Sequence, residues 1–194
     1  MIMSDFSAVL LAGGKSTRMG RDKAAVLYEG RELWARQLDT LRATDAGELF
    51  ISGQLDGSYS AAGVPIIVDE KPGLGPLAGI VTALRHARFE CLLVLAIDLP
   101  AMTSGFLARL VESAKAARCG VVPANGPWFE PMAAVYTRDC LPLAEEHLRS
   151  ADRGMQRFIR EALTRRMLLT YPISAEERPL FRNVNTPADL RNEL

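Results

Sequence analysis

The sequence predicts an α/β protein in which helices cover a largely parallel sheet. Short apolar runs alternate along the chain with longer segments of helical periodicity, and this alternation is typical of such a sheet. The 194 residues are 48% apolar, which is enough for one substantial core, and no Pro/Gly/Ser-rich linker divides them. We therefore expect a single domain over residues 1–194.

The strands are predicted from the short apolar runs. They are Phe6–Leu11, Glu48–Ser52, Val64–Val68, Cys91–Ile97, Gly120–Pro123, Met132–Tyr136 and Met167–Ile173. The run CLLVLAI over Cys91–Ile97 is apolar throughout, which indicates a central strand buried on both faces.

The helices are predicted from apolar side chains recurring on one face and from residues suited to helix starts. They are Arg31–Ala43, Gly75–Arg88, a segment from Thr103 or Ser104 to Ala117, Asp139–Leu148, Arg153–Thr164 and a last helix opening at Thr186-Pro187. Pro76 suits a first helical turn because that position needs no backbone N–H, and Thr103 or Ser104 can cap the next helix.

Charge and cysteine content exclude several classes of function. The formal net charge is zero, so no global field favours nucleic acid or an anionic membrane. No segment approaches 18 continuous apolar residues, and the N-terminus lacks the basic region of a signal peptide. Cys91, Cys119 and Cys140 form no C-x-x-C motif, which argues against a disulfide scaffold or a zinc site. We expect a cytoplasmic protein without nucleic-acid or membrane partners.

The loop after the first predicted strand has the chemistry of a polyphosphate site. Gly13 and Gly14 allow a tight turn that brings N–H groups close to a ligand, and cationic side chains follow at Lys15, Arg18 and Lys23. Gly14-Lys15-Ser16 copies the end of a P-loop, but the first glycine of that motif would fall at Val9, inside the strand. An ordinary glycine-rich turn is the alternative.

Two carboxylates follow predicted strands. Asp98 lies just past the central strand, where side chains point into the crevice of an open α/β sheet, and Mg²⁺ prefers one or two carboxylates together with phosphate oxygens. Asp69 follows the strand that ends at Val68. The alternative for both is a turn residue, because aspartate readily bonds to nearby backbone groups.

The segment Gly73–Ala78 matches G-x-G-x-x-A, the fingerprint of a dinucleotide-binding turn. Three residues separate its first glycine from Asp69, so the preceding strand does not run directly into the motif. An NAD(P)-binding reductase therefore stays a lesser alternative.

The whole loop, LAGGKSTRMGRDK over Leu11–Lys23, resembles the signature LAGGxSxRMGxDK of the molybdenum cofactor guanylyltransferases, the molybdopterin-guanine dinucleotide biosynthesis protein A family of the nucleotidyltransferase superfamily. Ten of its thirteen positions match. Further segments resemble the family's G-P-L-A-G, [EQ]-P and N-[IV]-N-T-P-x-D-L. They are Gly75–Gly79, Glu130-Pro131 and Asn183–Leu190.

The resemblance implies a three-layer α/β/α Rossmann-like nucleotidyltransferase fold with a mostly parallel mixed sheet. Its N-terminal half would bind nucleotide and its C-terminal half would face the pterin acceptor. The implied reaction transfers GMP from GTP to the terminal phosphate of molybdopterin and releases pyrophosphate. Mg²⁺ is the implied metal, with Mn²⁺ as an alternative. Implied partners are GTP and molybdopterin, together with other molybdenum cofactor biosynthesis proteins or a molybdoenzyme acceptor.

The resemblance also implies roles for individual residues. The catalytic set is Arg18, Lys23 and Asp98, with Asp98 also the metal ligand. The nucleotide-binding set is Leu11, Ala12, Gly13, Gly14, Lys23, Gln54, Asp69, Gly79 and Asp98. The acceptor-binding set is Glu130, Asn183 and Asn185. We expect the backbone amides of Ala12 to Gly14 to hold the nucleotide.

Two positions bear on the choice of base. Gly13 indicates guanine, because the related cytidylyltransferases carry L-A-A-G where this chain has Leu11–Gly14. Gln54 is a departure, since family members often have asparagine there in an I-S-x-N stretch, and the longer glutamine leaves CTP open.

Three other functions remain open. They are a nucleotidyltransferase that uses CTP or a sugar-phosphate acceptor, the NAD(P)-binding reductase, and a module that senses GTP without turnover. The arginines at 153, 157 and 160 would share one helical face, which favours a solvated surface over a landing site for a pterin phosphate or a partner.

Overall fold

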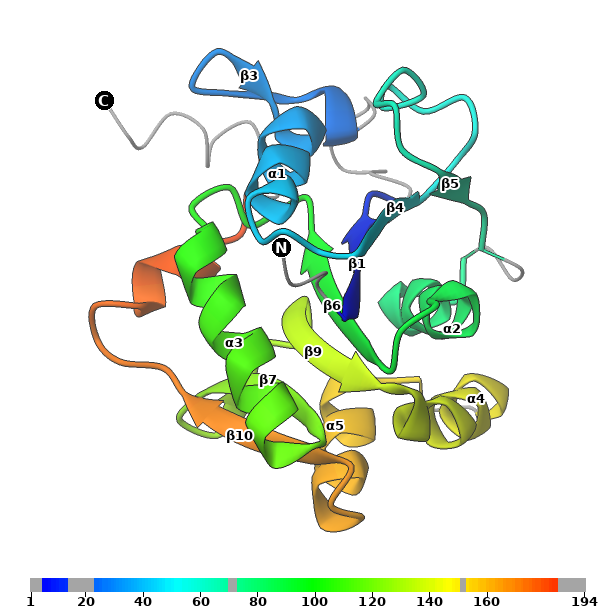
Figure 1. Cartoon of the computed structure of the whole chain (residues 1–194), viewed down its shortest axis with the longest axis vertical. Coiled ribbons are helices and arrows are strands. Elements are labelled where there is room, and N and C mark those ends of the chain that lie inside the picture. The colour runs from blue at the N-terminus through cyan, green and yellow to red at the C-terminus, as the bar shows by residue number, and fades with distance from the viewer. Residues whose placement is uncertain (1–4, 14–22, 70–72, 151–152, 185–194) are drawn as a thin grey trace.

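The computed structural model describes residues 5–13, 23–69, 73–150 and 153–184 (Figure 1). Its main sheet contains β1 (Phe6–Leu11), β4 (Glu48–Ser52), β5 (Ile66–Ile67), β6 (Cys91–Ala96), β7 (Gly120–Asn125), β8 (Trp128–Phe129), β9 (Ala133–Thr137) and β10 (Leu168–Pro172). The order is β10-β7-β9-β6-β1-β4-β5, and β8 pairs with β7. The β9 strand runs antiparallel to β6 and β7, whereas β1 pairs in parallel with β4 and β6. The predicted mostly parallel mixed sheet is confirmed.

Among the described residues, five α-helices form the outer layers: α1 (Leu33–Arg42), α2 (Pro76–His86), α3 (Ser104–Ala117), α4 (Leu141–Arg149) and α5 (Met155–Thr164). Side chains of α1 and α3 share a core with Ala8 and Leu10 of β1. Side chains of α2, α4 and α5 share the other core with Val9 and Leu11. Because successive side chains of a strand point to opposite faces, β1 separates two helical layers, as Figure 1 shows, and the three-layer α/β/α fold is confirmed.

The predicted helix starts have the expected chemistry. Gly75 precedes α2 with a φ of 81°, in the left-handed region that glycine adopts without strain, and Pro76 occupies the first turn. Thr103 caps α3, since its Oγ1 accepts a hydrogen bond from the Phe106 N–H at 3.3 Å. Three short 3₁₀ helices, η1 (Lys23–Ala25), η2 (Arg138–Cys140) and η3 (Arg178–Phe181), complete the helical segments described.

Most predicted boundaries differ from the structure by one or two residues, and three of them are instructive. The first helix begins at Leu33 rather than Arg31, because β3 (Arg31–Glu32) pairs with β2 (Leu27–Tyr28) in a small hairpin. The predicted strand Val64–Val68 is only Ile66–Ile67. The α5 helix begins at Met155, after an extended Gly154, so Arg153 lies outside the helical row of arginines. The helix expected at Thr186 lies outside the described residues.

Within the part of the chain that the structure describes, no helix is both long and apolar enough to span a membrane.

Candidate active site

The strand order reverses at the centre of the sheet, between β1 and β6. From β1 the chain proceeds through α1 to β4 on one side, and from β6 it proceeds through α3 to β7 on the other. Such a reversal leaves a crevice beyond the carboxyl ends of the two strands, where open α/β sheets bind ligands. Gly13 follows β1 and Asp98 lies in the turn after β6, so the structure brings two predicted site residues to this crevice.

The first turn beyond β1 is tied to the neighbouring strand. The Ser52 carbonyl, at the end of β4, accepts hydrogen bonds from the backbone N–H groups of Ala12 at 2.9 Å and Gly13 at 3.1 Å. These two donors are therefore already used, which corrects the expectation that they hold the nucleotide. Gly14 lies outside the described residues. Gly13 is exposed, so a ligand could approach this turn.

Ser52 also holds one of the predicted carboxylates. Its Oγ donates to Asp69 Oδ1 at 3.0 Å, and Ser52 itself is only 2% exposed. Partial burial raises the pKa of Asp69 above its ordinary value, and the Ser52 hydrogen bond opposes that rise. The Asp69 carboxylate is thus partly buried just beyond β5, and the Ser52 hydroxyl fixes its position.

Gly79 lets α2 approach this cluster closely. A Cβ built on Gly79 would lie 3.2 Å from Ser52 Oγ, 3.3 Å from Leu11 Cδ2 and 3.6 Å from Asp69 Oδ1. The structure therefore brings Leu11, Asp69 and Gly79 together around Ser52. Sequence reasoning treated Ser52 only as a strand end.

A tyrosine shapes the loop after β4. Tyr59 is 2% exposed, and its hydroxyl accepts a hydrogen bond from the backbone N–H of Gln54 at 2.7 Å. Its ring lies so close to Gly53 and Gly57 that a Cβ at either glycine would overlap it. Gln54 is exposed, so this loop holds the Gln54 backbone while leaving its side chain to solvent at the carboxyl edge.

The turn that carries Asp98 is anchored through its backbone carbonyls. The Leu99 carbonyl accepts a hydrogen bond from Gln37 Nε2, and the Pro100 carbonyl accepts one from Arg36 Nε at 2.7 Å, both from α1. The Asp98 carbonyl accepts the N–H of Val184 at 2.9 Å. Asp98 is half-buried, and these bonds fix the backbone of the turn from which its carboxylate extends.

The Val184 hydrogen bond also brings to the site a residue that is predicted to bind the acceptor substrate. Asn183 directly precedes Val184 and is exposed, so it lies beside the Asp98 turn although 85 positions separate the two in sequence. Asn185 lies outside the described residues.

Glu130 stands one strand away from Asp98. It lies in the turn between β8 and β9. Because β9 runs antiparallel to β6, this turn is at the edge of the sheet where β6 ends. The Ala96 N–H at the end of β6 accordingly donates to the Met132 carbonyl at 2.8 Å. Burial raises the pKa of Glu130. Gln156 of α5 holds the preceding residue, Phe129, at both its N–H (3.1 Å) and its carbonyl (2.8 Å).

The donor set suits a metal held jointly with a ligand. No group of three or more His, Cys, Asp or Glu side chains that could hold an ion occurs among residues 5–13, 23–69, 73–150 and 153–184. Mg²⁺ does not need one, since it commonly takes one or two carboxylates and completes its shell with phosphate oxygens and water. Asp98 at the crevice fits that role.

The structure does not describe the side chains of the two predicted catalytic cations, Arg18 and Lys23. Arg18 lies outside the described residues, and Lys23 begins η1 with its side chain outside the description. Arg153, which precedes α5, and Arg157 and Arg160 on the helix are all exposed, and the Arg160 guanidinium lies 5.9 Å from the centre of the Phe129 ring. This arrangement agrees with a solvated face.

Sequence reasoning missed the anchoring residue Gln37, and a signal for it was present. Gln37 is fully buried on α1, four positions from both Leu33 and Leu41, which are buried on the same helix. A polar residue in the middle of an apolar helical stripe needs a buried partner, and here the partner is the turn carrying Asp98.

Known proteins resemble this chain in sequence and in fold. The model of the MobA-like NTP transferase domain matches residues 8–167. A probable molybdenum cofactor guanylyltransferase of Opitutus terrae is 35% identical, over 98% of this chain and 95% of its own length. One from Pelotomaculum thermopropionicum is 34% identical, over 97% and 91%.

A solved structure from Archaeoglobus fulgidus, a molybdopterin-guanine dinucleotide biosynthesis protein A, superposes with a TM-score of 0.78 at 26% identity and covers 95% of both chains. The family-model match spans most of the chain, and the identities exceed 30% over nearly its full length. This chain belongs to the MobA-like NTP transferase family, and it is a nucleotidyltransferase.

Proposed function

We propose that this protein transfers GMP from GTP to the terminal phosphate of molybdopterin and releases pyrophosphate. The observation that carries the proposal is the position of Asp98. It lies at the crevice where the strand order reverses between β1 and β6, next to the exposed turn at Gly13. The names of the relatives support a guanine nucleotide as the donor and the molybdenum cofactor as the acceptor.

The reaction needs positioning more than it needs a protein nucleophile. An acceptor phosphate oxygen attacks the α-phosphorus of GTP in line, the new P–O bond forms, and the bond to pyrophosphate breaks. A phosphate is already anionic near neutral pH, so its oxygen can attack without a general base. Catalysis then depends on alignment and on neutralising charge.

The residues divide this work. Asp98 would hold Mg²⁺, which supplies positive charge against the phosphates when bound, and Arg18 and Lys23 would offset charge on the triphosphate. The nucleotide would lie against Leu11–Gly14, Gln54, Asp69 and Gly79. Glu130, Asn183 and Asn185 would face the acceptor.

The half-buried positions of Asp69 and Asp98 favour these roles over turn residues on the open surface. We treat the chain as one nucleotidyltransferase domain, and its free cysteines Cys91, Cys119 and Cys140 suit a reducing cytoplasm.

The test is pyrophosphate release with GTP, Mg²⁺ and molybdopterin. We expect Asp98→Ala to reduce kcat/KM by roughly 10³-fold or more, since a lost metal ligand removes several kcal/mol of transition-state stabilisation. Asp139→Ala is the matched control, because Asp139 is exposed after β9, at the opposite edge of the sheet. Near-normal release by folded Asp98→Ala would overturn the assignment. Turnover of CTP alone, or GTP binding without pyrophosphate release, would favour the alternative functions.

A further inference from the structure

Two charged groups of the proposed reaction come from different segments of the chain. Asp98 follows β6, whereas Lys23, the predicted cation, ends the loop after β1 and begins η1. The α1 helix contacts both segments. Ala24 of η1 is fully buried in a core that it shares with Leu38 of α1. On the same helix, Arg36 bonds to the turn that carries Asp98. The helix is therefore placed to set the position of one segment relative to the other.

Arg36 makes three contacts through one guanidinium group. Its Nε donates to the Pro100 carbonyl at 2.7 Å, in the turn after β6. The same group lies 5.1 Å from the centre of the Tyr28 ring, on the strand β2 that follows η1. Its Nη1 pairs with Glu29 at 2.8 Å. A guanidinium presents a planar fork of N–H donors and also stacks on aromatic rings, so it suits all three contacts together, whereas a lysine ammonium does not.

The hairpin that carries Tyr28 is a firm support for this link. A two-residue turn joins β2 to β3, and its first residue, Glu29, has a φ of 50°. Positive φ values are typical of the tightest hairpin turns, and a residue other than glycine adopts them at a cost. The ion pair with Arg36 holds Glu29 there. Tyr28 itself is 7% exposed and shares a small core with Leu33 and Val184.

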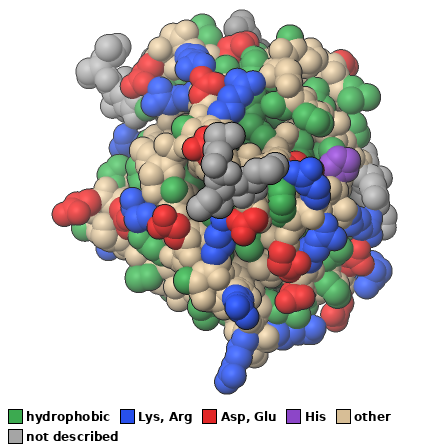
Figure 2. Space-filling view, viewed as in Figure 1, with side chains coloured by type: hydrophobic (Ala, Val, Ile, Leu, Met, Phe, Trp, Pro, Cys, Tyr) green, Lys and Arg blue, Asp and Glu red, His purple; other side chains and the backbone are tan. Residues whose placement is uncertain are grey.

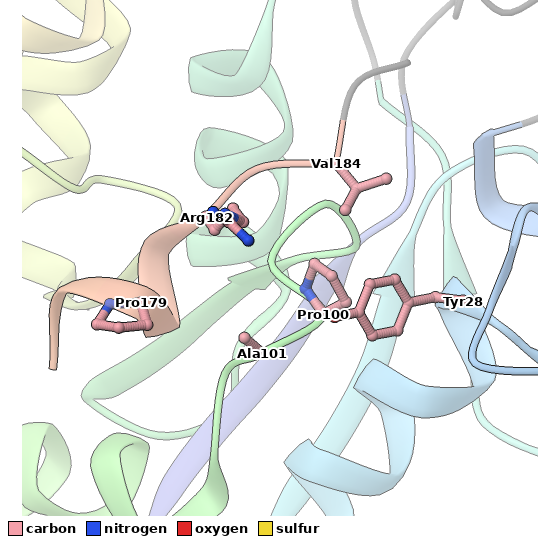
Figure 3. A pocket seen from close by; sticks show the side chains of 6 residues that line it. All are labelled: Tyr28, Pro100, Ala101, Pro179, Arg182 and Val184. Carbon is pink, nitrogen blue, oxygen red and sulfur yellow. The ribbon is translucent and has the colours of Figure 1, made fainter. Parts of the chain in front are cut away.

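The other side of the Asp98 turn faces a cavity. Tyr28 and Pro100 lie side by side on the wall of this cavity of about 380 Å³, which Ala101 also lines (Figure 3). Side chains that face a cavity have no packing partner on that side, so dispersion contacts there do not fix the turn. The position of the turn therefore depends on its hydrogen bonds, and Arg36 supplies the one at Pro100.

Two other roles for Arg36 fit these contacts less well. A phosphate-binding cation needs free donors, but the Nε, the Nη1 and one face of this guanidinium are already used. An ion pair alone would contribute little, because the Glu29 side chain is 61% exposed and water screens the pair. Figure 2 shows basic and acidic side chains intermingled over α1 and the hairpin, which agrees with charges that are paired with one another.

We propose that Arg36 is a positioning residue, which fixes the turn carrying Asp98 relative to the hairpin that continues the predicted polyphosphate loop. The inference rests on the proposed role of Asp98 and adds a residue to the machinery of that reaction. Arg36 acts on the alignment of the carboxylate with the nucleotide phosphates and does not itself touch a substrate. Because a displacement of about 1 Å can cost an aligned reaction roughly 10²-fold in rate, loss of this link should lower kcat.

Arg36→Lys and Arg36→Ala test the proposal. The first keeps the positive charge but loses the planar fork, and the second removes all three contacts. Arg42→Lys and Arg42→Ala are the matched controls, because Arg42 also lies on α1, pairs with Asp39 at 3.2 Å and donates to a backbone carbonyl, that of Ala62, at 2.8 Å. Ala62 lies between β4 and β5, so the controls lose the same kinds of contact away from the Asp98 turn.

Three measurements separate positioning from general stability. They are kcat and the KM for GTP in pyrophosphate release, amide hydrogen exchange over residues 97–102 in the protein without ligands, and urea unfolding. Exchange reports on the turn directly, because the Met102 N–H bonds to the Leu99 carbonyl at 3.0 Å within it. This measurement needs neither metal nor nucleotide.

We expect each Arg36 variant to lower kcat by about tenfold or more, with the KM for GTP changed by less than about threefold, and to speed exchange over residues 97–102. Each Arg42 variant should keep wild-type kcat and wild-type exchange over those residues, even where it lowers stability to urea. Wild-type kcat or wild-type exchange in the Arg36 variants would overturn the proposal, and so would an equal loss of kcat in the Arg42 variants. Should Arg36→Ala not fold, Arg36→Lys decides.

The outcomes also distinguish this proposal from the proposed function. If Asp98→Ala loses pyrophosphate release while both Arg36 variants keep it, the function stands and the positioning role is wrong. If folded Asp98→Ala keeps pyrophosphate release, the role assigned to Asp98 is wrong. Exchange then tests the link by itself: faster exchange in the Arg36 variants supports it, and unchanged exchange overturns it.

Discussion

Replacing Gly79 by alanine tests the close approach of α2 to the nucleotide side of the site. The added Cβ would lie 3.2 Å from Ser52 Oγ and 3.3 Å from Leu11 Cδ2, which is closer than ordinary van der Waals contact. Neither neighbour is free to move, because Ser52 is 2% exposed and bonded to Asp69, and Leu11 is 7% exposed in the core. We expect the Ser52–Asp69 hydrogen bond to lengthen and the strand end to shift.

The expected cost follows from two opposed effects. Alanine gains about 0.8–1.0 kcal/mol of helix propensity over glycine, and overpacking in a close-packed site costs about 1–3 kcal/mol. The net change for Gly79→Ala is therefore a destabilisation of roughly 0–2 kcal/mol. Gly105→Ala is the matched control, since Gly105 lies on α3, is exposed, and a Cβ there would meet no atom within 4 Å. Gly105→Ala should stabilise the protein by up to about 1 kcal/mol.

Urea unfolding of both variants measures the difference, in which the propensity gain largely cancels and the overpacking cost of about 1–3 kcal/mol remains. GTP binding provides the functional readout, and we expect Gly79→Ala to weaken it while Gly105→Ala leaves it unchanged. Equal stabilisation of the two variants, with wild-type GTP affinity in both, would refute the packing argument at Gly79.

Three further predictions concern base choice and pH. Gly13→Ala should fold normally, because its Cβ would lie at ordinary contact distances, 3.7 Å from Gly53 Cα and 3.8 Å from the Ser52 carbonyl. We expect it to lower the preference for GTP over CTP by roughly tenfold in a competition assay. Unchanged selectivity would show that Gly13 is not the cause of the preference. Asp69→Asn should raise Tm at pH 7, since a carboxyl whose pKa is raised by burial favours the fold below its ordinary pKa of 3.8 and loses that contribution as pH rises through the folded value; a variant with the wild-type pH profile of Tm would contradict this. Glu161→Gln should lower Tm at pH 7 and converge with wild type in acid. The His147 hydrogen bond, 2.9 Å long, lowers the pKa of Glu161, so its contribution is present above the ordinary 4.5 and is lost as pH falls through the folded value; thermal melts across that range would show it.

Elements with strong local signals were predictable. The continuous apolar run at Cys91–Ile97 became the central strand β6, and Pro76 and Thr103 stand at the helix starts they indicated. The boundaries that differed depend on tertiary pairing or on single residues of low helix propensity. Arg31 and Glu32 fit a helical pattern, yet hairpin pairing with β2 removes them from α1, and Gly154 shortens α5.

The sequence predicts candidate site residues, but it does not predict the contacts that position them. Spacing after strands is enough to choose Asp69 and Asp98, since every parallel strand ends at the same edge. Nothing in the local sequence indicates that Val184 bonds to the Asp98 carbonyl or that Gln37 bonds to the Leu99 carbonyl, because these contacts join segments more than 60 positions apart. The bonds from the Ala12 and Gly13 amides to the Ser52 carbonyl were hidden as well, because they also join separate segments of the chain.

Two sets of hydrogen bonds therefore hold the two halves of the candidate site. The Ser52 carbonyl fixes the turn beyond β1 while its hydroxyl fixes Asp69, and the carbonyls of the Asp98 turn are held by α1 and by Val184. In a reaction that depends on in-line alignment, a displacement of either half by about 1 Å can cost roughly 10²-fold in rate. Gln37 is buried and bonds to the turn that carries Asp98, so we expect its replacement to lower kcat through the position of that turn.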